Sequence, residues 1–120
     1  MLLKPLLDLK KDVVIGLGEI GIALHKLFSK SYIIEGFDIN HKLIPKNLKK
    51  NELLQVRFLH ICIPYTKNFN SQIIKLEKKF QPQGIVIHST IKPSTTSSIQ
   101  RKLQIPVIYS ATRGVHKRML

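Results

Sequence analysis

VVIGLGEIG, residues 13–21, is the stretch of this sequence that decides its fold. Three apolar residues predict a short buried strand, and the pattern Gly-x-Gly-x-x-Gly follows at once over 16–21. Apolar residues then recur at helical spacing over 19–30. The glycine pattern alone is weak, but a strand that opens through it into a helix is typical of the phosphate-binding turn of dinucleotide-binding proteins.

The three glycines have separate physical reasons in such a turn. Gly16 permits the tight turn, Gly18 lets the main chain approach a pyrophosphate, and Gly21 lets the helix pack on the strand. The helix N-terminus adds unpaired N–H groups that attract phosphate. The candidate cofactor-binding residues of the turn are Gly16, Leu17, Gly18, Glu19, Ile20 and Gly21. The alternative is an ordinary tight turn that binds no ligand.

Glu19 does not suit a phosphate site, since a carboxylate beside a pyrophosphate is unfavourable. Its place in the first helical turn is favourable for a negative charge, because the helix dipole is positive there. We expect Glu19 to point away from the phosphates or to order a bridging water.

An acid stands where a ribose-binding carboxylate is expected. A second apolar strand, 32–37, ends at Asp38, which follows Gly16 by 22 residues. A carboxylate about 20 residues after the glycines accepts hydrogen bonds from ribose hydroxyls in dinucleotide-binding domains. Asp38 would repel a 2′-phosphate, so NAD is favoured over NADP, and Lys42 nearby softens that preference.

The rest of the chain alternates apolar strands with helical patterns. Further strands are predicted at 57–63, 84–88 and 105–109, and residues 40–46 are predicted as a loop. Helices are predicted at 47–55, at 69–80 with Asn68 as its cap, and from Ser94 or Thr95 to about 103. Continuously apolar strands between helices predict an α/β fold. We expect a Rossmann-like doubly wound parallel sheet of about five strands, in the order 3-2-1-4-5, with helices on both faces.

Length and composition limit the domain organisation. The 120 residues predict a single domain over 1–120, with 1–11 as an N-terminal extension. A single cysteine, Cys62, excludes an internal disulfide scaffold. There is no apolar run of about 18 residues and no signal-peptide pattern, so we expect a cytoplasmic protein with no membrane partner.

The charge is strongly basic, with 20 Lys and Arg against 7 Asp and Glu and a net charge of +13. No acid follows Glu77, whereas eight Lys and Arg do. Such a surface attracts nucleotides, nucleic acid or an acidic partner. The alternative is a basic surface that serves solubility only.

Four segments together resemble the N-terminal NAD-binding domain of the UDP-glucose/GDP-mannose 6-dehydrogenase superfamily. They are VVIGLGEIG (13–21), GFDIN (36–40), LHICIPY (59–65) and HSTIKPSTT (88–96), and the resemblance covers about 12–114. It implies that Ile63, Pro64 and Tyr65 line the adenosine and pyrophosphate side of the cofactor. It also implies that Ser89 and Thr90 lie near the nicotinamide. His88 departs from the family, which often has Glu there, and Ser94 stands where the family has Gly.

The resemblance also implies what the chain lacks. The nucleophilic cysteine and the lysine of this family lie in later domains, so no catalytic residue is assigned, and no substrate domain is present. Cys62 is interpreted as a small buried hydrophobe. Ser110–His116 is similar to the segment that enters the substrate region. We therefore expect a truncated or partner-dependent NAD-binding unit, related to oxidoreductases but with little activity alone.

Two other functions stay open: a stand-alone NAD(H)-sensing module, and a nucleic-acid-binding protein that uses its basic half. Either a homodimer or a partner subunit fits a cofactor unit of this kind. The five histidines show no metal-ligand spacing. His60 is interpreted as a satisfied core or edge residue, and His88 is a candidate to reach the cleft. His116 with Arg113 is a candidate to bind an anion of a neighbouring domain or subunit.

Overall fold

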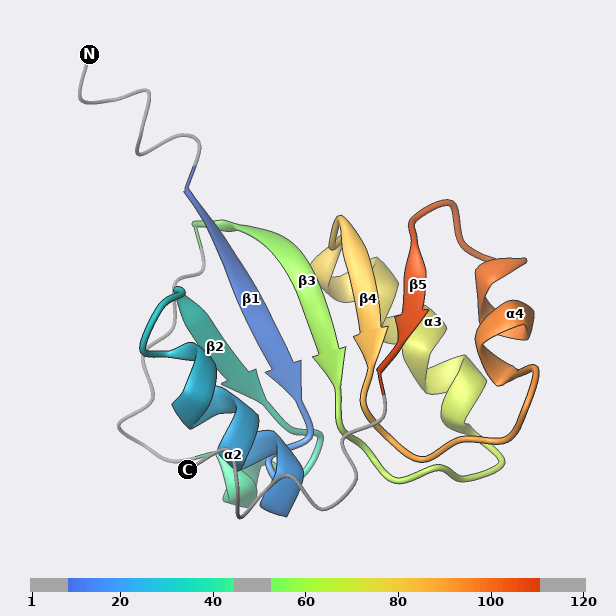
Figure 1. Ribbon diagram of the computed structural model, residues 1–120, viewed down its shortest axis with the longest axis horizontal. Coiled ribbons are helices and arrows are strands. Elements are labelled where there is room, and N and C mark those ends of the chain that lie inside the picture. Colours follow the sequence, from blue (N-terminus) through green and yellow to red (C-terminus); the bar gives the residue numbers. More distant parts are fainter. Residues whose placement is uncertain (1–8, 45–52, 111–120) are drawn as a thin grey trace.

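The computed structural model describes residues 9–44 and 53–110, and these form one parallel sheet with helices on both faces (Figure 1). The strands are β1 (Lys10–Ile15), β2 (Ile34–Phe37), β3 (Gln55–Ile61), β4 (Gly84–Ile87) and β5 (Val107–Tyr109). Every pairing in the sheet is parallel, and the order is β2-β1-β3-β4-β5. The predicted α/β, Rossmann-like fold class is confirmed.

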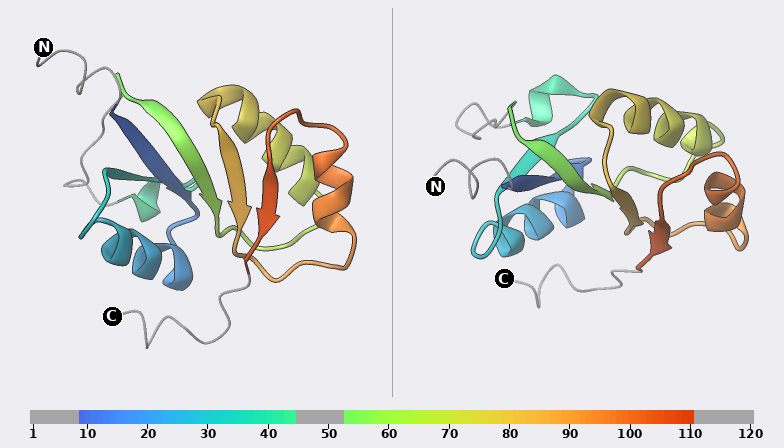
Figure 2. Two further views of the ribbon diagram at one scale, coloured as in Figure 1. Left: turned by 45° about the horizontal axis from the view of Figure 1, so that its top comes forward. Right: turned by 90° about the horizontal axis from the view of Figure 1, so that it is seen from above.

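The helices separate by face. They are α2 (Glu19–Phe28), α3 (Phe69–Phe80) and α4 (Thr95–Gln100), with a short 3₁₀ turn, η1 (His41–Leu43). Figure 2 shows α2 on one side of the sheet and α3 on the other, and Ile99 of α4 packs into the core on the α3 side. Within the described ranges, no helix combines the length and the apolar character needed to cross a bilayer.

The predicted strand order, 3-2-1-4-5, was wrong. β3 pairs with β1 on the side opposite β2, so β2 is an edge strand. The observed order equals the classic 3-2-1-4-5-6 with its third strand left out and the rest renumbered. The reason lies in β3, because Leu59, His60 and Ile61 are all buried, which suits a central strand with neighbours on both sides.

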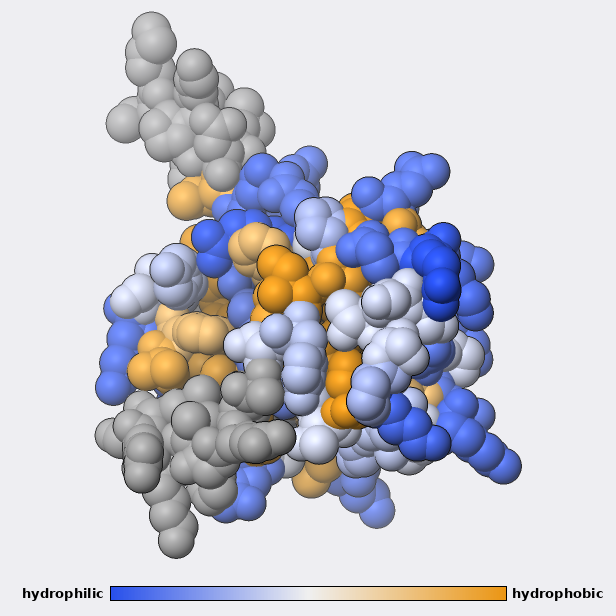
Figure 3. Space-filling model, turned by 45° about the vertical axis from the view of Figure 1, so that its right-hand side comes forward, coloured by the Kyte–Doolittle hydropathy of each residue, from blue (hydrophilic) through white to orange (hydrophobic). Residues whose placement is uncertain are grey.

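Alternate residues of the central strands face two separate cores. Val13 and Ile15 of β1 pack with Ile61, Ile87 and the α3 side chains, whereas Val14 packs with Leu24 of α2. This is why the strands read as continuous apolar runs. Over β5 the α2 side is more open: Ile108 is 51% exposed, and Figure 3 shows an apolar stripe bordered by hydrophilic side chains.

Most element boundaries lie within two residues of the prediction, and α3 was predicted at its observed bounds, 69–80. Asn68 stands at the cap position, but its side chain makes no capping hydrogen bond. The N-terminal extension is shorter than predicted, because Lys10 and Lys11 belong to β1. The helix α4 ends at Gln100, whereas the prediction extended it to about 103. Most of the predicted helix over 47–55 lies outside the described residues, but Gln55, its predicted last residue, begins β3. Residues 111–116, which include the candidate anion-binding residues Arg113 and His116, also lie outside the described residues.

Candidate functional site

A cavity of about 360 Å³ opens at the carboxyl ends of β1, β3 and β4. Its lining residues are Gly18, Glu19, Ile20, Cys62, Ile63, Pro64, Tyr65, His88, Ser89 and Thr90. In the order 2-1-3-4-5, the chain reverses direction across the sheet between β1 and β3, which is where open α/β sheets bind ligands. The structure thus brings three segments singled out in the sequence into one cavity.

Backbone packing fixes two of the three glycines. Gly16 has φ +94°, and a Cβ there would lie 2.9 Å from the carbonyl carbon of Cys62. A Cβ on Gly21 would lie 1.6 Å from the carbonyl oxygen of Gly16. Gly18 is different, because nothing lies within 4 Å of the place a Cβ would occupy. Packing of the chain therefore does not require a glycine at position 18, and the space beside it is open to a ligand.

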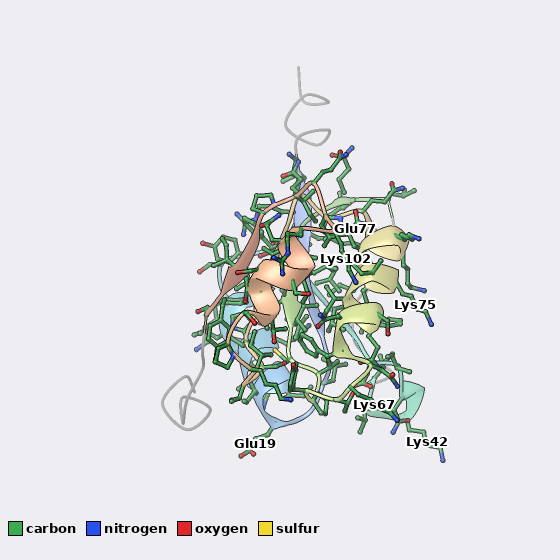
Figure 4. All side chains as sticks on the ribbon, turned by 90° about the vertical axis from the view of Figure 1, so that its right-hand side faces the viewer. Glu19, Lys42, Lys67, Lys75, Glu77 and Lys102 are labelled. Carbon is green, nitrogen blue, oxygen red and sulfur yellow. The ribbon has the colours of Figure 1, made fainter. Side chains whose placement is uncertain are left out.

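The first turn of α2 faces this open space. Gly18 is the N-cap residue, and its carbonyl accepts a hydrogen bond from the N–H of Ile22 at 3.0 Å. The N-cap residue is a glycine, so no N-cap side chain accepts from the first N–H groups of the helix. Glu19 borders the cavity, and Figure 4 shows its side chain projecting outward from the end of the molecule. That orientation agrees with the prediction that Glu19 points away from a bound phosphate.

Asp38 holds the glycine turn in place. The N–H of Leu17 donates to Asp38 Oδ2 at 2.7 Å, and the N–H of Asn40 donates to Oδ1 at 2.8 Å. A carboxylate has about four acceptor positions, so it retains capacity for ribose hydroxyls. Asp38 does not itself line the cavity, and neither do Gly16, Leu17 and Gly21, which shape the turn around it.

The opposite wall comes from the segment after β3 and from the end of β4. The Ser89 hydroxyl donates to the carbonyl oxygen of Ile63 and so ties the two segments together. The Tyr65 hydroxyl lies 3.2 Å from Thr95 Oγ1, which anchors this wall to the start of α4. Thr90 is exposed at the rim. The Ser89 hydroxyl therefore donates its hydrogen within the protein, whereas the Thr90 hydroxyl is exposed and accessible to a ligand.

His88 lines the cavity, as the sequence suggested for a candidate to reach the cleft, and Cys62, which was interpreted as a packing residue, lines it as well. Burial raises the pKa of the Cys62 thiol to about 12, so it is not a thiolate at neutral pH. This supports its interpretation as a packing residue rather than a nucleophile.

A buried row of polar side chains leads away from His88. His88 Nε2 lies 3.0 Å from His60 Nδ1, and His60 Nε2 lies 2.9 Å from Asp12 Oδ2. Arg57 binds both oxygens of the same carboxylate, at 2.9 and 3.0 Å. The interpretation of His60 as a satisfied core residue fits these contacts. The described residues contain no cluster of His, Cys, Asp and Glu suited to a metal ion.

Burial and mutual contact shift the pKa values along this row. Burial alone would raise the pKa of Asp12, but hydrogen bonds from His60 and Arg57, with their charges, outweigh it and lower the pKa. Burial, aided by the charge of His60, lowers the pKa of His88 to about 4, against an opposing backbone hydrogen bond with Ser110. At neutral pH, Asp12 is therefore ionised and His88 is neutral.

Comparison with known proteins adds the fold but no function. No protein-family model and no curated protein matches the chain. A solved structure described as "Crystal structure of uncharacterized protein" aligns with a TM-score of 0.54 and 14% identity. The alignment covers 92% of this chain and 96% of that chain. The likeness shows the fold alone.

Proposed function

We propose that this chain binds NAD(H) in the cavity between β1 and β3. The observation that carries the proposal is Gly18, whose Cβ position is open in a turn where those of Gly16 and Gly21 are blocked by backbone atoms. The pyrophosphate would lie against Gly18 and the first turn of α2, where N–H groups and the helix dipole favour an anion. The adenosine ribose would lie toward Asp38, and the nicotinamide toward Thr90 and the end of β4.

The proposal includes a preference for NAD over NADP. The Asp38 carboxylate, fixed by two backbone N–H groups, would face the ribose hydroxyls and repel a 2′-phosphate. Lys42 is exposed in η1, and its N–H donates to the Asn40 side chain at 3.1 Å. Its ammonium weakens the discrimination without reversing it.

We further propose that the chain is a cytoplasmic cofactor-binding unit of the nucleotide-sugar dehydrogenase type, and that it needs a partner for turnover. Bound NAD would supply the hydride acceptor. The cavity's thiol is protonated, and its serine hydroxyl is used by the protein, so the described part of the chain offers no activated nucleophile. A homodimer or a partner subunit would supply the substrate-binding groups.

Calorimetric titration with NAD, NADH and NADP tests this proposal. We expect wild-type protein to bind NAD, and Asp38→Ala to weaken binding at least tenfold, or about 1.4 kcal/mol. Glu77→Ala, which removes a carboxylate on α3 away from the cavity, is the matched control and should bind normally. A wild-type protein that binds none of the three dinucleotides would overturn the proposal. Rapid oxidation of nucleotide sugars by the chain alone would overturn the need for a partner.

One observation favours nucleic acid as a second candidate ligand. Of the acids in the described ranges, Asp12 and Glu35 are buried in ion pairs with Arg57 and Lys11. Because each of these pairs is neutral, the rest of the molecule keeps the full cationic excess of the composition. Figure 4 shows Lys42, Lys67 and Lys75 directed outward along the α3 side. Binding of duplex DNA that weakens steeply between about 50 and 200 mM salt would support this candidate, because phosphate contacts release counterions.

A further inference from the structure

The polar row beside the cavity crosses the sheet from the site to the surface. At one end His88 lines the ligand cavity, and at the other Arg57 and Asp12 line a separate cleft of about 220 Å³. The Arg57 side chain is 38% exposed, whereas those of Asp12 and His60 are less than a tenth exposed. A hydrogen-bonded path therefore runs from solvent to the cavity among side chains that are otherwise mostly apolar.

The contacts along the row determine where its hydrogens lie. The ionised Asp12 carboxylate only accepts, so His60 Nε2 carries a hydrogen and donates it. One further hydrogen joins His60 Nδ1 to His88 Nε2. When that hydrogen resides on His88, both rings are neutral. When it resides on His60, His88 Nδ1 can carry another hydrogen toward the Ser110 backbone. The pair therefore accepts one extra proton without losing a hydrogen bond, and a second extra proton would break the row.

The groups around the His60–His88 pair determine its charge before a ligand binds. The charges of Asp12 from β1 and Arg57 from β3 neutralise one another. The ring of Phe28 from α2 packs on His60, with the two ring centroids 4.9 Å apart. On the cavity side lie Glu19 of α2, the Cys62 thiol and the Tyr65 phenol. Burial holds His88 neutral at pH 7, since its pKa is about 4. An anion placed in the cavity would favour the extra proton, because opposite charges attract strongly in a poorly solvated site.

We propose that the His60–His88 pair takes up a proton when a negatively charged dinucleotide fills the cavity, and that NADH drives this uptake further than NAD. This inference rests on the proposed function and assigns a proton-linked regulation to the same site. The difference between the two cofactors follows from their charge. The oxidised nicotinamide ring is cationic and the reduced ring is neutral, so the reduced form leaves the pyrophosphate charge uncompensated near His88. By linkage, the affinity for NADH should rise as the pH falls, by at most about tenfold per pH unit for one proton.

Calorimetry at about pH 6, in buffers of different ionisation enthalpy, counts the protons taken up on binding. For wild-type protein we expect uptake of a substantial fraction of one proton with NADH, and less with NAD. The wild-type comparison needs no variant, so it stays decisive if a substitution impairs folding. Equal proton numbers for the two cofactors would overturn the inference while leaving NAD binding established.

Two variants locate the uptake. His88→Gln combined with His60→Gln removes both titratable rings of the pair, so the proton uptake that accompanies NADH binding should disappear. His25→Gln on α2, away from the row, is the matched control and should retain it. Uptake that persists when both histidines are replaced would overturn the assignment to this pair. Failure of wild-type protein to bind either cofactor would overturn the proposed function and this inference together.

Discussion

At the scale of single residues, the β1–α2 turn separates what the fold requires from what a ligand requires. Gly16 and Gly21 touch backbone atoms so closely that no side chain fits. Nothing lies within 4 Å of the place that a Cβ on Gly18 would occupy, and its φ of −75° is open to any residue. The same three-glycine pattern therefore contains two kinds of constraint that the sequence does not distinguish.

Alanine substitutions should show this difference. Gly21→Ala should cost about 3 kcal/mol or more of folding free energy, because the new methyl group collides with the Gly16 carbonyl. Gly18→Ala should cost less than about 1 kcal/mol, as for a poorer N-cap. It should nevertheless weaken NAD binding at least about tenfold. Urea unfolding and calorimetric titration measure the two effects. Gly18→Ala protein that binds NAD normally would contradict the ligand role of this residue.

The neutral, buried His88 makes folding stability depend on pH. Its pKa falls from the ordinary 6.5 to about 4 in the folded protein, so the unfolded chain binds more protons between these values. The contribution is complete above about pH 6.5 and is lost as the pH falls toward 4. The loss should amount to about 2–3 kcal/mol. His88→Gln lacks this contribution, so the stability difference between wild-type and variant protein should narrow on acidification. If urea unfolding showed the same difference in unfolding free energy between the two proteins from pH 7 to 4.5, a contribution from neutral His88 would be contradicted.

Sequence reasoning found most of the cavity but missed the polar row. Glycines, the Asp38 spacing and the segments after two strands are local patterns, so they could be recognised one at a time. Asp12 lies in β1 and His60 in β3, whereas His88 directly follows β4, and only parallel pairing brings them together. The available signal was three titratable residues within or beside apolar strands. Their meeting depended on β3 lying beside β1, which the predicted strand order did not have.

At the scale of elements, local chemistry predicted helices better than sheet neighbours. The bounds of α3 follow from its apolar periodicity, and the chain leaves the helix at Gln81 with φ 48°. Strand order depends on which apolar strand has neighbours on both sides, and composition alone does not reveal this. In this chain that strand is β3, whose residues Leu59, His60 and Ile61 are all buried.

The connection from α4 to β5 depends on one side chain. Gln100 Nε2 donates to the Ile105 carbonyl at 2.8 Å, and Gln100 Oε1 accepts from the Val107 N–H at 2.8 Å. Gln100→Ala would leave these backbone groups without their partner, so it should cost about 1–3 kcal/mol. Gln104→Ala, at an exposed position in the same connection, should change stability by less than about 0.5 kcal/mol. Equal effects of the two substitutions in thermal unfolding would contradict the bridging role of Gln100.

At the scale of the whole molecule, charge acts against compactness. The chain carries a net charge of +13, and buried ion pairs occupy two of the acids in the described ranges. Repulsion among the remaining surface cations destabilises the folded state, and salt screens it. A protein with this surface should therefore become more stable as the ionic strength rises.

The melting temperature should rise by a few degrees between about 0.05 and 0.5 M sodium chloride. Lys75→Glu, at an exposed position on α3, should raise the melting temperature at low salt and reduce its dependence on salt. Lys75→Arg keeps the charge and is the matched control. A melting temperature that falls with added salt would mean that attractive surface pairs dominate instead.

The strand order also has a consequence for the slow opening motions of the protein. The cavity lies over the ends of β1 and β3, and each of these strands is hydrogen-bonded to neighbours on both sides. Amides in such strands exchange with solvent only through the largest openings of a fold, whereas edge strands open locally. A ligand that binds only the closed sheet suppresses those openings by mass action. Occupancy of the cavity would then appear as slower deuterium uptake along β1 and β3, at amides far from the ligand itself.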